Sequence, residues 1–172
     1  MQRRRALLLT LTPLALAACG FQLRQAPKFG FQSLQLDGGI TPVAIELRRA
    51  LNAAGMRLVT PPPPRPPEST DPLPESPDVR LQVLQDQRER VVVGQTASGQ
   101  IRELQLRTRF RFRVTTPQGR ELIPDTELLQ TRDISFTETL VLGKEAEEAL
   151  MYKDMQSDIA QQVMRRLSAV KL

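Results

Sequence analysis

The clearest hydrophobic pattern in the chain is a strict alternation between residues 104 and 114. Every second position is apolar or Thr, and the intervening positions are Gln or Arg. A repeat of two residues is the period of a β-strand, so we predict a strand with one buried face. The buried row is Leu104, Leu106, Thr108, Phe110, Phe112 and Val114, and the opposite row contains Arg107, Arg109, Arg111 and Arg113.

Shorter alternating or apolar runs predict further strands. They cover residues 31–36, 56–59, 79–83 with a continuation at 91–93, and 120–132. Turn residues at 97–100 and at 116–119 connect the last three strands as hairpins. Pro124 has no amide hydrogen for a strand ladder, so the last strand is expected at a sheet edge or with a bulge.

A period of about 3.6 residues predicts two amphipathic helices. In the first helix, Thr41 resembles an N-cap, Pro42 occupies the favoured first position, and Gly55 follows the last turn. The second helix is expected at 145–168, after a loop at 133–143. Each helix has a single apolar stripe, which is expected to be buried against the strands.

These elements predict an α/β fold, a two-layer sandwich in which both helices pack on one face of a roughly four-stranded mixed or antiparallel sheet. The arginine row would lie on the uncovered face. The proline-rich segment 61–78 can form neither a helix nor a central strand. We expect it to be a loop inserted within a single mature domain, residues 19–172.

The first eighteen residues have the pattern of an export signal peptide. Arg3, Arg4 and Arg5 precede an apolar run that ends at Ala18 and is too short to span a bilayer. Cys19, the only cysteine, follows directly. Cleavage at another position would leave Cys19 as a free thiol, which is a liability in an exported protein.

Leu16–Cys19 resembles the lipoprotein signal of bacteria, in which the cysteine thiol receives a diacylglycerol before cleavage on its N-terminal side. The resemblance implies a lipid anchor at Cys19, with a further acyl chain on the freed amine in Gram-negative bacteria. Several acyl chains hold a protein at a membrane essentially permanently. Gly20 follows the cysteine in place of the Asp that retains such proteins in the inner membrane, which favours the outer membrane.

Composition excludes several kinds of catalysis. The chain contains no His, which removes Ser-His-Asp and Cys-His catalysis and the commonest zinc ligand. Paired carboxylates can hydrolyse glycosides, but no constrained pair is evident. We therefore predict a protein that is not an enzyme and that has no metal or cofactor.

The net charge is a weak guide to the ligand. The whole chain has a formal charge of +5, and three of its arginines belong to the signal, so the remainder has +2. Nucleic acid is not expected as a partner of an exported lipoprotein. The arginine row is either an ordinary solvated face or a surface for a phosphate- or carboxylate-rich ligand, because guanidinium groups bind such groups bidentately.

Three segments resemble the lipopolysaccharide-assembly lipoprotein family (LptE, or rare lipoprotein B). They are Cys19–Arg24, Gly94–Ala97, and the pattern from Leu142 to Leu167. The resemblance implies a sandwich of two helices and four strands. It also implies a partner, the outer-membrane β-barrel LptD, whose lumen the lipoprotein partly fills, and binding of lipopolysaccharide for delivery to the outer leaflet.

The resemblance further implies that basic residues near the tips of the sheet contact lipopolysaccharide. Lys144 occupies one of the matching positions. The other falls at Val92, which is not basic, so Arg90 and Arg102 are the candidates to replace it. Together with the arginine row, the candidate lipopolysaccharide-binding residues are Arg90, Arg102, Arg107, Arg109, Arg111, Arg113 and Lys144.

A second class of function fits the anchor and the fold equally well. A periplasm-facing scaffold lipoprotein, such as a secretin pilot or a transporter accessory, would have no glycolipid role and would leave the arginine row without a function. We therefore expect a lipid-anchored subunit of the lipopolysaccharide translocon at the outer membrane, facing the periplasm and the barrel lumen.

Overall fold

The computed structural model describes residues 27–61, 76–135 and 141–172. The signal peptide, Cys19 and most of the proline-rich segment therefore lie outside the described residues. None of the helices described is long and apolar enough to cross a membrane. In chain order the elements are β1 (Ser33–Asp37), α2 (Pro42–Ala53), β2 (Arg57–Val59), β3 (Val79–Gln95), β4 (Ile101–Thr115), β5 (Glu121–Ser135) and α3 (Val141–Ser168).

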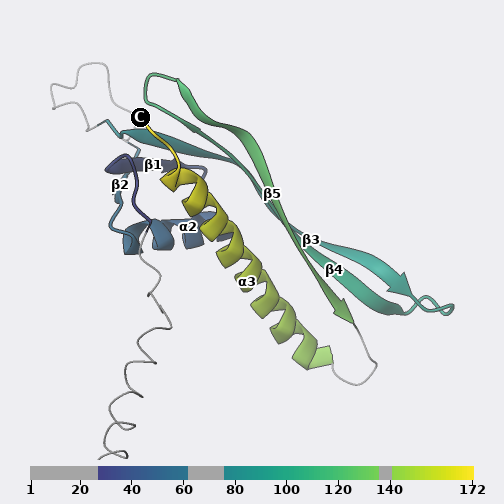
Figure 1. Cartoon of the computed structure of the whole chain (residues 1–172). Helices are drawn as coiled ribbons and strands as arrows, with labels where there is room; N and C mark the ends of the chain where they lie inside the picture. Colours follow the sequence, from purple (N-terminus) through teal and green to yellow (C-terminus); the bar gives the residue numbers. More distant parts are fainter. Residues whose placement is uncertain (1–26, 62–75, 136–140) are drawn as a thin grey trace, which may run out of the picture.

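The strands form one mixed sheet in the order β2-β1-β3-β4-β5. β1 is parallel to both of its neighbours, β2 and β3, whereas β3, β4 and β5 form an antiparallel meander. Both helices lie on the same face of this sheet (Figure 1). The predicted α/β sandwich is confirmed, with five strands where roughly four were expected, and the strand predicted at 56–59 is the edge strand β2.

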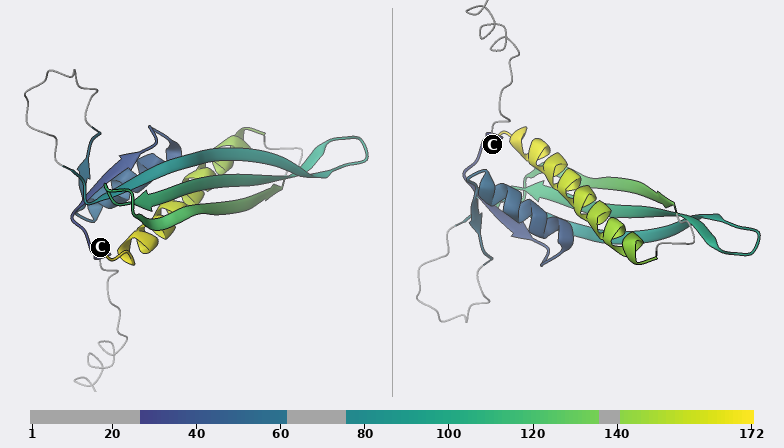
Figure 2. Two further views of the ribbon diagram at one scale, coloured as in Figure 1. Left: turned by 90° about the horizontal axis from the view of Figure 1, so that it is seen from above. Right: turned by 90° about the horizontal axis from the view of Figure 1, so that it is seen from below.

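The molecule is elongated, and its two ends differ (Figure 2). At one end, the β3–β4 hairpin extends beyond the start of α3; we call this the distal end. At the other end, the beginning of the described chain lies near its C-terminus; we call this the proximal end. α3 runs diagonally across the sheet between the two ends.

The main core lies between the sheet and both helices. Phe110 and Phe112 of β4 are fully buried, with ring centroids 5.7 Å apart, and pack with side chains such as Leu47 of α2 and Ile159 of α3. Full burial of such a side chain is worth about 1.5–3 kcal/mol relative to exposure. A smaller cluster, formed by Leu106, Ile134, Tyr152 and Met155, lies under the first half of α3.

The N-terminus of α2 is capped by a residue from β3. Thr41 is the N-cap, as predicted, but its side chain makes no capping hydrogen bond. Instead, the backbone N–H of Val43 donates to Asp86 Oδ2 at 2.9 Å. A carboxylate is favourable at this position because the N–H groups of the first turn have no partner within the helix. Gly55, with φ of 78°, follows the helix as expected.

β3 is one strand of seventeen residues. The sequence predicts a strand at 79–83 that continues or re-enters the sheet at 91–93, and it does not assign the polar residues 85–90 to a strand. A bulge between Val83 and Gln85 changes which positions face the helices. After it, Arg88 and Arg90 lie opposite buried residues of β4 and thus on the helix-covered face. Polar residues on both faces remove the alternation by which a strand is recognised.

β5 confirms the expectation for Pro124. The strand is at the edge of the sheet, and its register with β4 shifts between Ile123 and Thr126, on either side of the proline. The missing amide hydrogen therefore interrupts no regular pair of the ladder.

The loop predicted at 133–143 is shorter on both sides. β5 continues to Ser135, which pairs with Glu103, and α3 begins at Val141. The strand continues because Ile134 is buried in the smaller core cluster, so this segment belongs to the sheet.

Candidate functional site

The arginine row lies on the uncovered face of the sheet, as the alternation in β4 predicts. All the alternate residues of the opposite row are buried, which fixes the orientation of the strand. On the same face, Gln85 and Gln87 of β3 lie opposite Arg111 and Arg109, and Glu89 lies opposite Arg107.

Two arginines of the row form ion pairs with β5. Arg109 Nη1 lies 2.5 Å from Glu127 Oε1, and Arg111 Nε lies 3.1 Å from Asp125 Oδ1. The hydrogen bond to Glu127 raises the pKa of Arg109. Exposed pairs of this kind contribute only about 0–1 kcal/mol to stability, but they offset half of the positive charge in the row.

The other two arginines of the row donate to amide oxygens. Arg107 Nε donates to Gln105 Oε1 and Arg113 Nε donates to Gln82 Oε1, each at 2.8 Å. Because an amide is neutral, these guanidinium groups keep their full charge. The uncovered face is therefore of mixed sign, and its uncompensated cations lie at the two ends of the row.

A second charged group lies where β3 meets the first half of α3. Arg88 and Arg90 from the strand and Glu148 and Tyr152 from the helix line a hollow of about 640 Å³, which we call the β3–α3 cleft. Glu145 and Ala149 complete its lining. The cleft brings together residues about sixty positions apart in the chain.

Within the β3–α3 cleft, polar contacts order the side chains. Arg90 Nε lies 2.6 Å from Oε1 of the buried Glu148, and this hydrogen bond raises the pKa of Arg90. The hydroxyl of Tyr152 donates to the backbone oxygen of Glu89 at 2.9 Å, and burial raises the pKa of Tyr152. The Arg88 guanidinium carbon lies 5.2 Å from the centre of the Tyr152 ring, a cation–π distance.

Arg88, Glu148 and Tyr152 were not candidates from the sequence. Arg88 and Arg90 are separated by one residue, the same spacing as in the arginine row, and this signal could have identified Arg88. The polar composition of 85–90 concealed it. Among the described residues Arg88 has no carboxylate partner, so it is the cation of the cleft whose charge is not offset by an ion pair.

The predicted site residues do not form one group. Lys144, near the start of α3, lies 2.8 Å from Glu147 Oε2, one helical turn away. Arg102 is exposed beside the distal hairpin, and Arg90 is in the β3–α3 cleft. Val92, at the position where the resemblance implies a basic residue, is 42% exposed and lies opposite Leu104. These four residues belong to the distal half of the molecule, whereas the arginine row runs along the uncovered face.

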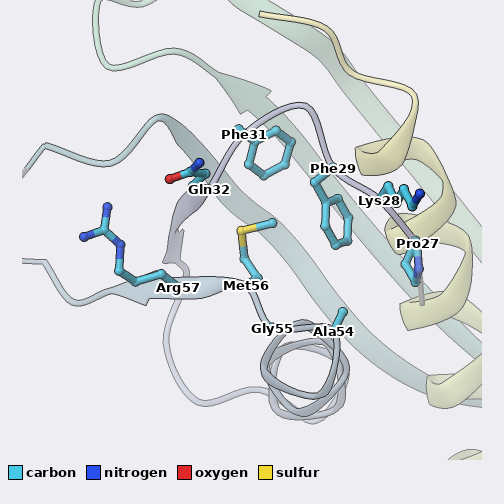
Figure 3. Close-up of a pocket in the computed structure, with 9 residues that line it drawn as sticks. All are labelled: Pro27, Lys28, Phe29, Phe31, Gln32, Ala54, Gly55, Met56 and Arg57. Carbon is cyan, nitrogen blue, oxygen red and sulfur yellow. The ribbon is translucent and has the colours of Figure 1, made fainter. Parts of the chain in front are cut away.

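A separate hollow of about 750 Å³ lies at the proximal end. Phe29, Phe31 and Met56 line it with apolar surface, and Lys28 lies at its edge (Figure 3). In the described part of the chain, no group of three or more Cys, His, Asp or Glu residues is arranged to bind a metal ion.

Three solved structures similar to this one are bacterial lipoproteins. An uncharacterized lipoprotein B from Nitrosomonas europaea is 28% identical, with a TM-score of 0.67 over 87% of this chain and 91% of that one. A minor lipoprotein from Acinetobacter baumannii is 22% identical, with a TM-score of 0.60 over 83% of this chain and 94% of that one. Rare lipoprotein B from Shewanella oneidensis is 19% identical, with a TM-score of 0.62 over 80% of this chain and 94% of that one. At such identities the last two establish the fold alone.

A comparison with curated proteins found no significant match. Among protein families, residues 31–167 match LptE, described as lipopolysaccharide-assembly. This match covers all strands of the sheet and both helices except Ser168, the last residue of α3. The chain therefore belongs to the LptE lipopolysaccharide-assembly family.

Proposed function

We propose that this protein is a lipid-anchored outer-membrane subunit of the lipopolysaccharide translocon, which binds lipopolysaccharide and partly fills the barrel of LptD. The observation that carries the proposal is the family match over residues 31–167. The role is non-enzymatic, consistent with an assembly family and with a chain that lacks His. The protein would help to assemble the barrel and to deliver glycolipid to the outer leaflet.

The anchor is proposed at Cys19. The residues before it have the order of a lipoprotein signal, and an acylated cysteine would be the first residue of the mature chain. Each buried methylene of an acyl chain contributes about 0.8 kcal/mol, so several chains make release negligible. Membrane attachment then needs no apolar helix.

The glycolipid site is proposed at cations that the protein does not neutralise itself. Lipopolysaccharide contains phosphorylated sugars, and Arg107 and Arg113 have charge available for phosphate because their partners are amides. Arg102 at the distal hairpin and Arg88 in the β3–α3 cleft are also without carboxylate partners among the described residues. Arg90, Arg109, Arg111 and Lys144 would have to exchange a carboxylate for the ligand.

Binding of lipopolysaccharide to the acylated mature protein tests this site. Arg107→Gln/Arg113→Gln removes the two uncompensated charges of the row. A hydrogen bond to a charged group is worth about 1.5–3 kcal/mol. We therefore expect the dissociation constant for lipopolysaccharide to rise at least about tenfold.

The matched control is Arg48→Gln/Arg49→Gln on α2, which removes the same charge outside the candidate site. We expect this control to change the dissociation constant less than about twofold, in line with the small energies of exposed charges. Equal effects of the two variants would show that binding depends on net charge only. Binding that survives loss of Arg107 and Arg113 would favour the scaffold function.

The partnership with the barrel requires a separate experiment. The protein is purified from detergent-solubilised outer membranes, and co-purifying proteins are identified by mass. We expect a large β-barrel protein at a constant ratio, because a plug and its barrel share an extensive surface. Recovery of the anchored chain alone would contradict the translocon role.

A further inference from the structure

The proximal end is the part of the domain closest in the chain to Cys19. The described chain begins at Pro27, and a Cβ atom added to Gly30 would lie only 2.9 Å from the backbone oxygen of Val170. The beginning of the chain is thus packed against the segment that follows α3. Both views in Figure 2 place these segments opposite the β3–β4 hairpin.

Exposed cations without partners gather at this end. Lys28, Arg166 and Lys171 are exposed, and no described residue forms a hydrogen bond or ion pair with their side chains. Unlike these three cations, Arg132 on β5 has a carboxylate partner, Asp158, at 3.1 Å. Glu121, at the start of β5, brings an opposing charge to this end.

These cations border apolar surface. Lys28 lies beside Phe29 at the edge of the 750 Å³ hollow (Figure 3). Arg166 and Lys171 line a second hollow of about 340 Å³, whose other walls are mainly apolar. The apolar residues of this second hollow are Leu122, Ile123, Pro124, Ala169 and Val170. Apolar surface with a basic rim is typical of proteins that bind the headgroup region of a membrane.

The length of the chain limits where this surface can be. Eight residue steps separate Cys19 from Pro27 and span at most about 29 Å in any conformation. An acylated Cys19 therefore keeps the proximal end within about 29 Å of the bilayer. Attraction between the cations and an anionic leaflet acts over a Debye length of about 8–10 Å. The tether is short enough to let the cations come within this distance of the leaflet.

We infer that the proximal end binds anionic phospholipid headgroups of the leaflet that holds the anchor. The contact orients the domain with the β3–β4 hairpin away from that leaflet. This inference rests on the proposed acylation of Cys19. It adds a second attachment, which sets the orientation of a domain that the acyl chains alone would leave free to rotate.

The experiment uses the acylated mature protein in vesicles whose headgroups carry a fluorescence quencher. Acylation consumes the thiol of Cys19, so Ala169→Cys introduces a single labelling site at the proximal end, and Ser98→Cys does so at the distal hairpin. In phosphatidylglycerol vesicles we expect stronger quenching at residue 169 than at residue 98. The difference should decrease in phosphatidylcholine vesicles, and also when salt is raised from about 0.1 M to about 1 M.

Lys28→Gln/Arg166→Gln/Lys171→Gln tests the cations, and Arg48→Gln/Arg49→Gln/Lys153→Gln is the control of equal charge. Each neutralised cation should reduce the ratio of docked to undocked protein roughly fivefold. The control should retain the quenching, and both variants should keep the wild-type thermal unfolding midpoint. Equal quenching at the two labels, or equal effects of the two triple variants, would overturn the inference while leaving the proposed function intact. Protein that fails to float with the vesicles would overturn both, because the acyl chains would then not hold the domain at a membrane.

Discussion

Asp78 fixes the point at which β1 and β3 meet. Its Oδ2 accepts hydrogen bonds from the backbone N–H groups of Gln32 and Ser33 at 2.8 and 2.9 Å, and its own N–H donates to Ser33 Oγ at 2.9 Å. The backbone hydrogen bond from Gln32 is the main cause of a lowered pKa at Asp78. This reciprocal set of bonds precedes the first residue pair of the parallel ladder, Leu34 with Val79.

The lowered pKa makes part of the stability pH-dependent. The unfolded Asp has a pKa of about 3.9, and the folded pKa lies below it. The stabilisation is therefore complete above the unfolded pKa and is lost as the pH falls through the folded pKa. We expect Asp78→Asn to reduce the free energy of unfolding by about 1 kcal/mol or less at neutral pH, since a neutral acceptor forms weaker hydrogen bonds.

Denaturant unfolding of wild type and Asp78→Asn at several pH values measures this effect. The difference between the two proteins should decrease toward zero as the pH is lowered through the folded pKa of Asp78, where the wild-type side chain becomes protonated and neutral like Asn. A difference that is independent of pH would show that the charge of Asp78 contributes nothing to the ladder.

At the scale of elements, the predictability of a strand follows its pattern of burial. β4 was predicted because it has one buried and one solvated face. β3 was predicted only in part, because beyond Gln85 its helix-covered face contains the polar side chains of Asp86, Arg88 and Arg90. Each of these contacts a helix, so their position on this face depends on tertiary contacts that no local repeat encodes.

Asp86 gives a prediction for α2. Asp86→Ala removes the acceptor of the Val43 N–H and should destabilise the protein by about 0.5–1 kcal/mol. The estimate is at the low end for a cap because Oδ1 of Asp86 is buried without a partner among the described residues, and its removal relieves a desolvation cost. The midpoint of denaturant unfolding measures the change.

Glu46→Ala is the matched control, because this carboxylate is on the same helix but only pairs with the exposed Arg49. Its loss should cost less than about 0.5 kcal/mol. Equal destabilisation by the two variants would mean that Thr41 or water replaces Asp86 as the cap.

At the scale of the whole molecule, the fold was more predictable than the candidate site. Each element has its own pattern, and two helices with single stripes and strands with single apolar faces leave few ways to pack. The site depends on register between strands. Nothing near the arginine row in the sequence shows that Asp125 and Glu127 lie beside it, and only the tertiary fold brings Arg90 to Glu148.

Because of the bulge between Val83 and Gln85, the face that each later residue of β3 occupies depends more on the number of residues in the strand than on their identity. A chain lacking only Leu84 would keep every later pair with β4, because the ladder would simply run straight through the deletion. A chain that lacks a single residue between 85 and 87 and keeps the bulge would exchange the two rows instead, turning Arg88 and Arg90 outward and Glu89 toward α3. Homologous chains should therefore vary in side-chain identity along this stretch but gain or lose residues only at the bulge.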